Sequence, residues 1–377
     1  MLYGSVLTRQ LSAATGRASG QTGAGQIPVS ARLVIVFVVD GLRPDAITAG
    51  DTPTLHRLRA EGVDFANSHA VFPTVTRVNA ATLATGTQPG THGIVGNQIF
   101  VPDVDPARAL DTAAYRRLLE VDRATGGRLV LTRTLAERLE ARGLRLAAVS
   151  SGSTGSALLT NPRAPAGVGV LVNGYLDPGQ RVAWPDDVSA AILAKFGAAP
   201  PKGRGAERYD AAVTWTQRVL REYVLPELAP AVVINWITEP DHTQHGLGVG
   251  SPAAREALRH ADREIAQVLA ALDGLGLAGS TDVFVASDHG FTTNTAGVDV
   301  ARELIDAGLK ASAGLRRRGP GEQRAGGRAA RGGARTANGS RASRASSSRA
   351  TGEACSSPPA GRRATRAAPS TARSRWT

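Results

Sequence analysis

Carboxylates and histidines gather at three points of the sequence, and each point directly follows an apolar, β-branched stretch. Asp40 follows LVIVFVV, Glu239, Asp241 and His245 follow AVVINWI, and Asp288 and His289 follow DVFVAS. Carboxylate oxygens and imidazole nitrogens together are the usual ligands of catalytic zinc and of similar divalent ions. If the three points meet in the folded chain, they can form a metal centre.

The apolar stretches have the composition of buried β-strands, with helices predicted between them. Strands are predicted at residues 33–39, 144–150, 231–237 and 282–287, and helical spacing covers residues 54–61, 134–142, 206–225 and 252–275. This alternation favours an α/β fold with a mainly parallel central sheet flanked by helices. Ligands of such sheets bind beyond the carboxyl ends of the strands, so the three points should meet at one edge.

A hydroxyl that could act as a nucleophile lies in Pro73-Thr74-Val75-Thr76, where a turn gives way to a predicted helix. The free N–H groups and the positive dipole end of a helix N-terminus favour a bound phosphate. Thr74 and Thr76 are also ordinary helix-capping residues. Local chemistry alone therefore does not choose between the two threonines, or between a catalytic and a capping role.

The ordered motifs of residues 31–290 resemble the type I phosphodiesterase/nucleotide pyrophosphatase family of the alkaline phosphatase superfamily. The motifs are VVDGLRPD, TPTLHRL, FPTVTRVNAATLATGTQPGTHGIVGN, EPDHTQHG and SDHG. The resemblance implies an alkaline phosphatase-like core with two divalent metal ions, expected to be Zn²⁺, that clamp one phosphoryl group. Carried over by motif, the ligands of one metal are Asp40, Thr76, Asp288 and His289, and those of the other are Asp241 and His245.

The resemblance also implies catalytic roles around Thr76. A metal-bound hydroxyl has a lowered pKa, and Thr76 would attack phosphorus to form a phospho-threonine that water hydrolyses. Asn97 and the backbone N–H of Arg77 would donate to the non-bridging phosphate oxygens. Arg77 is expected to contact the substrate, because many relatives have an aromatic residue here that contacts the base or the leaving group. The arginine leaves nucleotide preference open and would suit an anionic substituent.

We therefore expect a hydrolase of phosphodiester or pyrophosphate bonds that acts on a small-molecule phosphodiester or nucleotide. A phosphomonoesterase or phosphonate hydrolase of the same superfamily is the nearest alternative. A second alternative is a truncated product with impaired activity. In the family the second metal needs a further histidine downstream of the Asp-His motif, and none of the seven histidines follows His289.

The last part of the chain has a different composition. From Leu315 to Thr377 there are fifteen arginines, two acidic residues and no lysine, so residues 1–314 carry almost no net charge. This composition cannot form a core and predicts a disordered tail. The tail is either an arm that binds nucleic acid or the product of a frameshift that removes the C-terminal part of the core; the absence of lysine favours the frameshift. We expect no specific nucleic-acid partner.

These observations divide the chain into a flexible extension (1–30), an incomplete catalytic core (31–312) and the arginine-rich tail (313–377). No apolar run approaches the roughly 20 residues of a membrane span, and residues 1–30 contain no apolar segment typical of a secretory signal. The family resemblance nevertheless implies work outside the cytoplasm. Cys355 is the single cysteine, which excludes an internal disulfide. The sequence predicts no oligomeric state.

Three histidines to which the resemblance gives no ligand role are interpreted as structural. His92 lies in a glycine-rich turn and is predicted to pin that loop, His242 is predicted to be an exposed loop residue, and His260 is predicted to lie on the surface of a helix.

Overall fold

The computed structural model describes residues 7–10, 33–202, 208–294 and 296–310. The described elements all belong to one unit, Met1–Gly321. The arginine-rich tail predicted at 313–377 lies outside the described residues. Of the extension predicted at 1–30, only Leu7–Gln10 is described. Within the described part, no helix is both long enough and apolar enough to cross a membrane.

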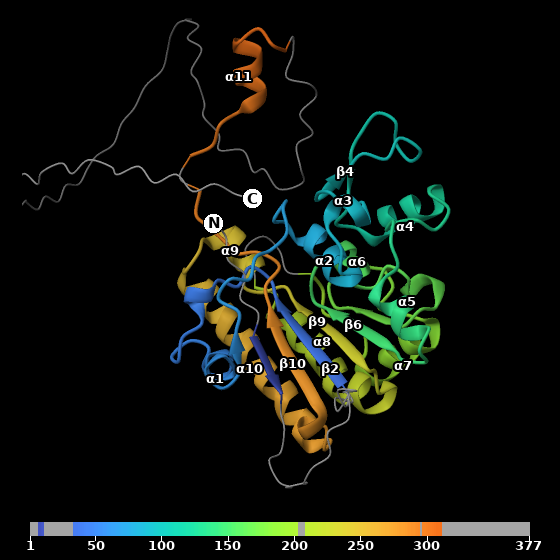
Figure 1. Cartoon of the computed structure of the whole chain (residues 1–377), viewed down its shortest axis with the longest axis vertical. Coiled ribbons are helices and arrows are strands. Elements are labelled where there is room, and N and C mark those ends of the chain that lie inside the picture. Colours follow the sequence, from blue (N-terminus) through green and yellow to red (C-terminus); the bar gives the residue numbers. More distant parts are fainter. Residues whose placement is uncertain (1–6, 11–32, 203–207, 295, 311–377) are drawn as a thin grey trace, which may run out of the picture. The chain divides into compact units, whose positions relative to one another are not determined.

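A mixed sheet forms the centre of the described unit (Figure 1). Its strand order is β3-β1-β10-β2-β9-β6-β7-β8. The strands are β1 (Leu7–Gln10), β2 (Leu33–Val39), β3 (Val63–Asp64), β6 (Leu146–Ser150), β7 (Val170–Asn173), β8 (Ala183–Trp184), β9 (Val232–Ile237) and β10 (Thr281–Ala286). The five central strands run parallel, and the three outer ones pair antiparallel. The predicted α/β fold with a mainly parallel sheet is therefore confirmed.

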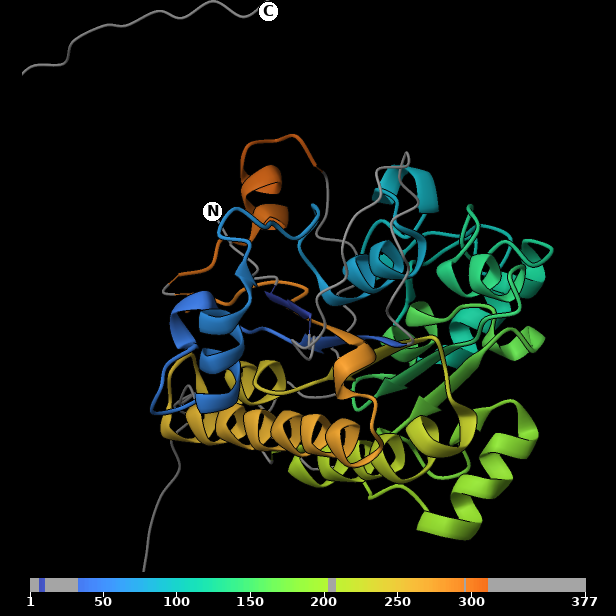
Figure 2. The ribbon, with the colours of Figure 1, turned by 60° about the horizontal axis from the view of Figure 1, so that its bottom comes forward.

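Helices cover both faces of the sheet, and each layer has its own apolar core (Figure 2). One core contains side chains of α1 (Pro53–Glu61), α7 (Asp186–Phe196), α8 (Asp210–Val219) and α10 (Pro252–Gly274). The other contains side chains of α2 (Thr76–Thr85), α4 (Tyr115–Ala124), α5 (Leu135–Glu140) and α6 (Thr154–Thr160). Strand β2 is buried from both sides: Ile35 and Phe37 belong to the first core and Val38 to the second.

Shorter elements complete the described unit. They are the helices α3 (Pro89–His92), α9 (Asp241–Leu247) and α11 (Val300–Asp306), the 3₁₀ turns Pro44–Ala46, Ala164–Ala166 and Ala278–Ser280, and a separate two-stranded sheet of β4 (Gln98–Ile99) and β5 (Leu110–Asp111).

Two features of the fold differ from the sequence predictions. The helix predicted to end at residue 225 does not stop before Pro226, because α8 continues as a π-helical segment, Leu220–Leu228, that contains this proline. Its buried side chains, including Leu220 and Val224, pack into the core, and this tertiary packing outweighs the helix-breaking tendency of proline. Strand β1 lies between β3 and β10, although no element is predicted within residues 1–30.

Candidate metal centre and nucleophile

The register of the central strands brings the three acidic points together. Val38 of β2 pairs with Ala286 of β10, and Val39 pairs with Ile237 of β9. The carboxyl ends of these neighbouring parallel strands are therefore level, and the residues that follow them share one edge of the sheet. This is the edge at which the sequence predicts a metal centre.

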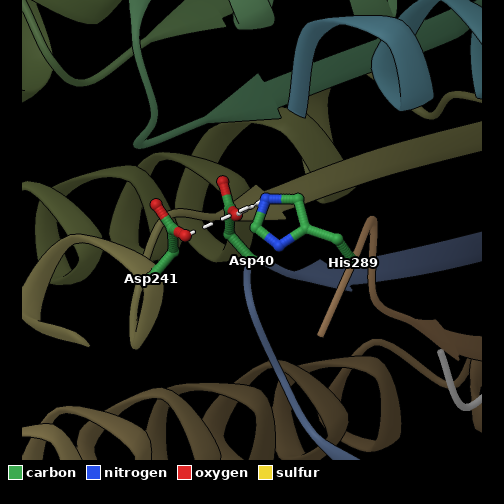
Figure 3. A group of neighbouring side chains, drawn as sticks. All are labelled: Asp40, Asp241 and His289. Carbon is green, nitrogen blue, oxygen red and sulfur yellow. Dashed lines mark ion pairs between the residues drawn. The ribbon is translucent and has the colours of Figure 1, made fainter. Parts of the chain in front are cut away.

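The imidazole of His289 lies at the middle of the resulting cluster. Its Nε2 atom is 3.6 Å from Asp40 Oδ1, 3.9 Å from Asp241 Oδ1 and 3.4 Å from Asp288 Oδ2. One ligand atom each of Asp40, Asp241 and His289 lies within 4.8 Å of the others, a spacing that one metal ion can span. Figure 3 shows these three side chains pointing toward one another from three different segments of the chain.

His245 joins the cluster through Asp241. The two residues are one turn apart on α9, and His245 Nε2 lies 3.5 Å from Asp241 Oδ1. Asp241 Oδ1 thus lies close to the imidazoles of both His245 and His289. The His245 side chain is 69% exposed, whereas that of His289 is 11% exposed. The structure therefore offers one buried and one solvent-facing imidazole on either side of a shared carboxylate.

Three carboxylate oxygens of the cluster are buried without a hydrogen-bond partner among the residues that the structure describes. They are Asp40 Oδ1, Asp241 Oδ1 and Asp288 Oδ2. In two of these carboxylates the other oxygen accepts a hydrogen bond. Asp40 Oδ2 accepts from the indole N–H of Trp236 at 3.0 Å, and Asp288 Oδ1 accepts from the backbone N–H of Gly41 at 3.3 Å. Buried polar atoms in native proteins nearly always have partners, and a divalent cation would satisfy all three oxygens. The donor set therefore fits a metal.

Burial and mutual repulsion act on the protonation of these carboxyl groups. Burial raises the pKa of Asp40 well above its ordinary value, and the neighbouring charges of Asp288 and Asp241 raise it further. Burial also raises the pKa of Asp241, although His245 and His289 oppose that change. A cation between these groups would reverse both effects, because it favours the ionised carboxylates.

Thr76 is the first residue of α2, and its hydroxyl faces the cluster. The N-cap of this helix is Val75, so Thr76 does not occupy the capping position. Its Oγ1 atom lies 3.2 Å from His289 Nε2. The hydroxyl, the start of the helix and the group of carboxylates are thus found at the same place.

Asn97 and Arg77 lie side by side next to Thr76. The Arg77 backbone N–H donates to Asn97 Oδ1 at 3.4 Å. The backbone carbonyl of Asn97 in turn accepts hydrogen bonds from the backbone N–H of Thr112 at 3.0 Å and from its hydroxyl at 2.8 Å. The two groups that the family resemblance implies as phosphate donors are therefore neighbours in the fold.

Glu239, an acidic residue at one of the three points, does not belong to the cluster. Glu239 is fully buried, and its carboxylate accepts from the backbone N–H and the hydroxyl of Thr243 and from the backbone N–H of Tyr209. It joins α9 to the start of α8. Glu239 is thus a structural carboxylate, whereas Asp241 of the same motif faces the cluster.

Sequence reasoning missed two residues that position the cluster. Trp236 reads as an ordinary core residue of β9, yet its indole holds Asp40. Gly41 has a φ of +70°, and a Cβ atom there would lie 3.1 Å from Cβ of Asp241. Only glycine allows this close approach at a positive φ. The Asp-Gly pair after β2 was the only sequence signal for this contact, and nothing local marks Trp236.

Of the three histidines interpreted as structural, the structure confirms the prediction for one and contradicts it for two. His92 is fully buried and pins its loop as predicted, accepting from Ile94 N–H at 3.1 Å. The prediction for His260 is wrong, because its side chain is only 15% exposed and lies 3.0 Å from the Thr214 hydroxyl. The prediction for His242 is also wrong: the residue lies in α9, half-buried, with its ring stacked on Tyr209 at 3.5 Å.

The chain is similar in sequence to venom phosphodiesterases and to an ectonucleotide pyrophosphatase/phosphodiesterase. It is 25% identical to venom phosphodiesterase 2 of Crotalus adamanteus over 260 residues, which covers 68% of this chain and 26% of the relative. It is 24% identical to ectonucleotide pyrophosphatase/phosphodiesterase family member 1 of Mus musculus over 258 residues, covering 68% of this chain and 24% of the relative. The chain thus spans about a quarter of the length of these curated relatives.

Among solved structures, the fold is similar to that of murine ectonucleotide pyrophosphatase/phosphodiesterase 5 in an inactive form bound to AMP. The match has a TM-score of 0.46 at 18% sequence identity and covers 68% of this chain and 57% of the other. A family model described as type I phosphodiesterase / nucleotide pyrophosphatase matches residues 34–350. Since this match spans most of the sequence and contains every residue of the cluster, the chain belongs to the type I phosphodiesterase/nucleotide pyrophosphatase family.

Proposed function

We propose that this chain is a metal-dependent hydrolase of phosphodiester or pyrophosphate bonds that uses Thr76 as its nucleophile. The observation that carries the proposal is the position of the Thr76 hydroxyl, 3.2 Å from His289 in a cluster with three unpartnered buried carboxylate oxygens. Membership of the family supports the reaction class.

Two divalent cations, for which zinc is the expected metal, would be held by the cluster. Asp40, Thr76, Asp288 and His289 are proposed to hold one, and Asp241 and His245 the other. Bound cations would lower the pKa of the Thr76 hydroxyl and offset the negative charge of the phosphoryl group. The two sets differ in burial, since the His245 side chain is largely exposed and that of His289 is enclosed.

Thr76, Asn97 and Arg77 are proposed to have different roles in the reaction. Thr76 Oγ1 forms a bond to phosphorus while the bond from phosphorus to the leaving-group oxygen breaks, which leaves a phospho-threonine. Water hydrolyses this ester and restores the hydroxyl. The side-chain amide of Asn97 and the backbone N–H of Arg77 are proposed to donate to the non-bridging oxygens, whose charge grows in the transition state.

The substrate is proposed to be a small phosphodiester or a nucleotide. The relatives are named venom phosphodiesterase and ectonucleotide pyrophosphatase/phosphodiesterase, and a setting outside the cytoplasm is proposed on the same ground. A phosphomonoesterase or phosphonate hydrolase remains the alternative activity.

The test compares hydrolysis of bis(p-nitrophenyl) phosphate and p-nitrophenyl phosphate by the zinc-loaded chain. We expect zinc-dependent turnover that favours the diester and is abolished in Thr76→Ala. Thr74→Ala is the matched control, because this threonine lies two residues before the helix and should retain activity. Dominant monoester turnover, or full activity of Thr76→Ala, would reject the proposal.

A further inference from the structure

The side chain of Arg77 is fixed in one position beside the nucleophile. Its Nε atom donates to the Thr112 hydroxyl at 3.1 Å, and its Nη2 atom donates to Asp111 Oδ1 at 3.3 Å. The side chain is 16% exposed, so it is largely enclosed but still open to solvent at one side. A long, flexible side chain is rarely held in this way without a use, because fixing it costs conformational entropy.

The group that holds Arg77 is itself tied to the phosphate donors. Thr112 donates twice to the Asn97 carbonyl, and Asn97 Oδ1 accepts from the backbone N–H of Arg77. Asp111 Oδ1 also accepts from Ala113 N–H at 2.8 Å, which orients its carboxylate. Hydrogen bonds thus link Arg77, Asn97 and Thr112 in a closed ring, and the guanidinium is positioned by the same residues that place Asn97.

The guanidinium keeps free hydrogen-bonding capacity. It carries five N–H donors, and two of its nitrogens each make one bond, to Thr112 and Asp111. Its Nη1 atom makes no hydrogen bond to any residue that the structure describes. A planar guanidinium with free N–H groups is well suited to phosphate, which it can bind through two oxygens.

The direction of the side chain indicates which phosphate it would meet. The backbone N–H of Arg77 lies beside Thr76 and Asn97, where the phosphoryl group under attack is proposed to bind. From there the side chain extends to Asp111 at the end of β5. The charges of Asp40 and Asp241, as well as that of Asp111, act on the guanidinium, so it lies near the metal cluster. A substrate group that extends from the phosphoryl position toward Asp111 would meet it.

We propose that Arg77, held by Asp111 and Thr112, forms an anion subsite beside Thr76 that binds a second phosphate group of the substrate. The chain then prefers substrates with linked phosphates, such as nucleoside polyphosphates, over diesters whose substituents carry no charge. This inference rests on the proposed function and adds to it the residue of this chain that would select such substrates.

The test measures kcat/KM of the zinc-loaded full chain for ATP and for bis(p-nitrophenyl) phosphate. In Arg77→Gln the ratio of the two values should fall roughly tenfold or more, mainly through KM for ATP, because a charge-assisted bond to the second phosphate is lost. Asp111→Asn should lower the same ratio, since it releases the guanidinium. Arg117→Gln is the matched control: this arginine lies on α4 and pairs with Glu120, and the ratio should not change.

Two results would overturn the inference. Equal losses on both substrates in Arg77→Gln would show that the arginine only braces the loop. A selective loss on bis(p-nitrophenyl) phosphate would show that it contacts the transferred phosphoryl group instead.

If the wild-type chain turned over none of the substrates, that result would count against the proposed function. The subsite would then be tested by a binding measurement. Calorimetry on the zinc-loaded chain would then compare ADP with AMP. A loss of ADP affinity in Arg77→Gln with unchanged AMP affinity supports the subsite, and equal affinities for ADP and AMP in the wild type refute it.

Discussion

The Nε2 atom of His289 lies 3.2 Å from the Oγ1 atom of Thr76, although the two residues are 213 positions apart in the chain. His289 lies shortly after the end of β10, and Thr76 is the first residue of α2. The level ends of the parallel strands β2, β9 and β10 make this contact possible, because they deliver Asp40, Asp241 and His289 to one edge.

The indole of Trp236 should set the orientation of Asp40. It holds Asp40 Oδ2 and leaves Oδ1 free to face the cluster. Trp236→Phe keeps a buried aromatic ring but removes the N–H donor, so we expect zinc affinity, measured by calorimetry, to fall by about tenfold or more.

Trp215→Phe provides the matched control for this substitution. The Trp215 indole nitrogen is also buried, but within the described part of the chain it makes no hydrogen bond. Its replacement should leave zinc affinity unchanged. Equal effects of the two substitutions would show that Trp236 acts only through packing.

Replacement of Gly41 should weaken both the fold and the metal centre. Gly41→Ala forces a side chain into a positive φ and places its Cβ atom 3.1 Å from Cβ of Asp241. We expect the free energy of unfolding to fall by about 1–3 kcal/mol, as measured by denaturant titration. Zinc affinity should fall as well, since the Gly41 N–H holds Asp288.

Gly50→Ala is the control for strain at Gly41. An added Cβ at Gly50 meets no atom within 4 Å, so stability should change little. The account of Gly41 would be wrong if both glycines tolerated alanine equally.

His245 should serve the weaker of two metal sites. We expect His245→Ala to remove a weak phase of zinc binding in calorimetry and to retain a tight phase, whereas His289→Ala should remove the tight phase. The difference follows from burial, because His245 is largely exposed and His289 is enclosed by three carboxylates. His242→Ala is the control on the same helix, since its ring stacks on Tyr209. A single phase lost equally in His245→Ala and His289→Ala would contradict two distinct sites.

Asp262 should make stability fall as pH rises through the acid range. Its buried carboxylate caps α1 by accepting from the N–H groups of Thr54 and Leu55, and burial raises its pKa above the ordinary value of 3.8. The folded state therefore keeps this proton to a higher pH than the unfolded chain does, so ionisation opposes folding above pH 3.8.

The measurement compares the wild type with Asp262→Asn, which cannot ionise. The difference in free energy of unfolding, wild type minus variant, should decrease as the pH rises from about 3 to about 6. An increase over this range would mean that the helix N-terminus lowers the pKa of Asp262 in the folded state.

Much of the architecture could be predicted from the sequence because its signals are local. The run LVIVFVV carries no polar residue, is short and is rich in β-branched residues, which predicts a strand buried on both faces, as β2 is. The motif spacing then places Asp40, Asp241 and Asp288 after strand ends, and parallel strands in register bring such ends together. The prediction of which residues surround the centre needed only this geometry and the family resemblance.

Contacts between distant segments could not be predicted in the same way. The indole bond from Trp236 to Asp40 joins residues 196 positions apart, and its donor has the sequence pattern of a core residue. The engagement of Glu239 with Thr243 and Tyr209 likewise depends on how α8 and α9 pack. His260 looked solvent-facing because charged residues surround it on α10, yet the helix turns it toward Thr214.

Detection of the covalent intermediate tests the central claim most directly. The zinc-loaded chain is mixed with bis(p-nitrophenyl) phosphate, quenched in acid within the first turnovers and digested for mass spectrometry. We expect a p-nitrophenyl phosphoryl group on Thr76, because one p-nitrophenolate leaves and the other ester bond stays intact, and we expect no modification on Thr74 or in the Thr76→Ala variant. Turnover with the modification on another residue, or turnover by Thr76→Ala, would contradict the account.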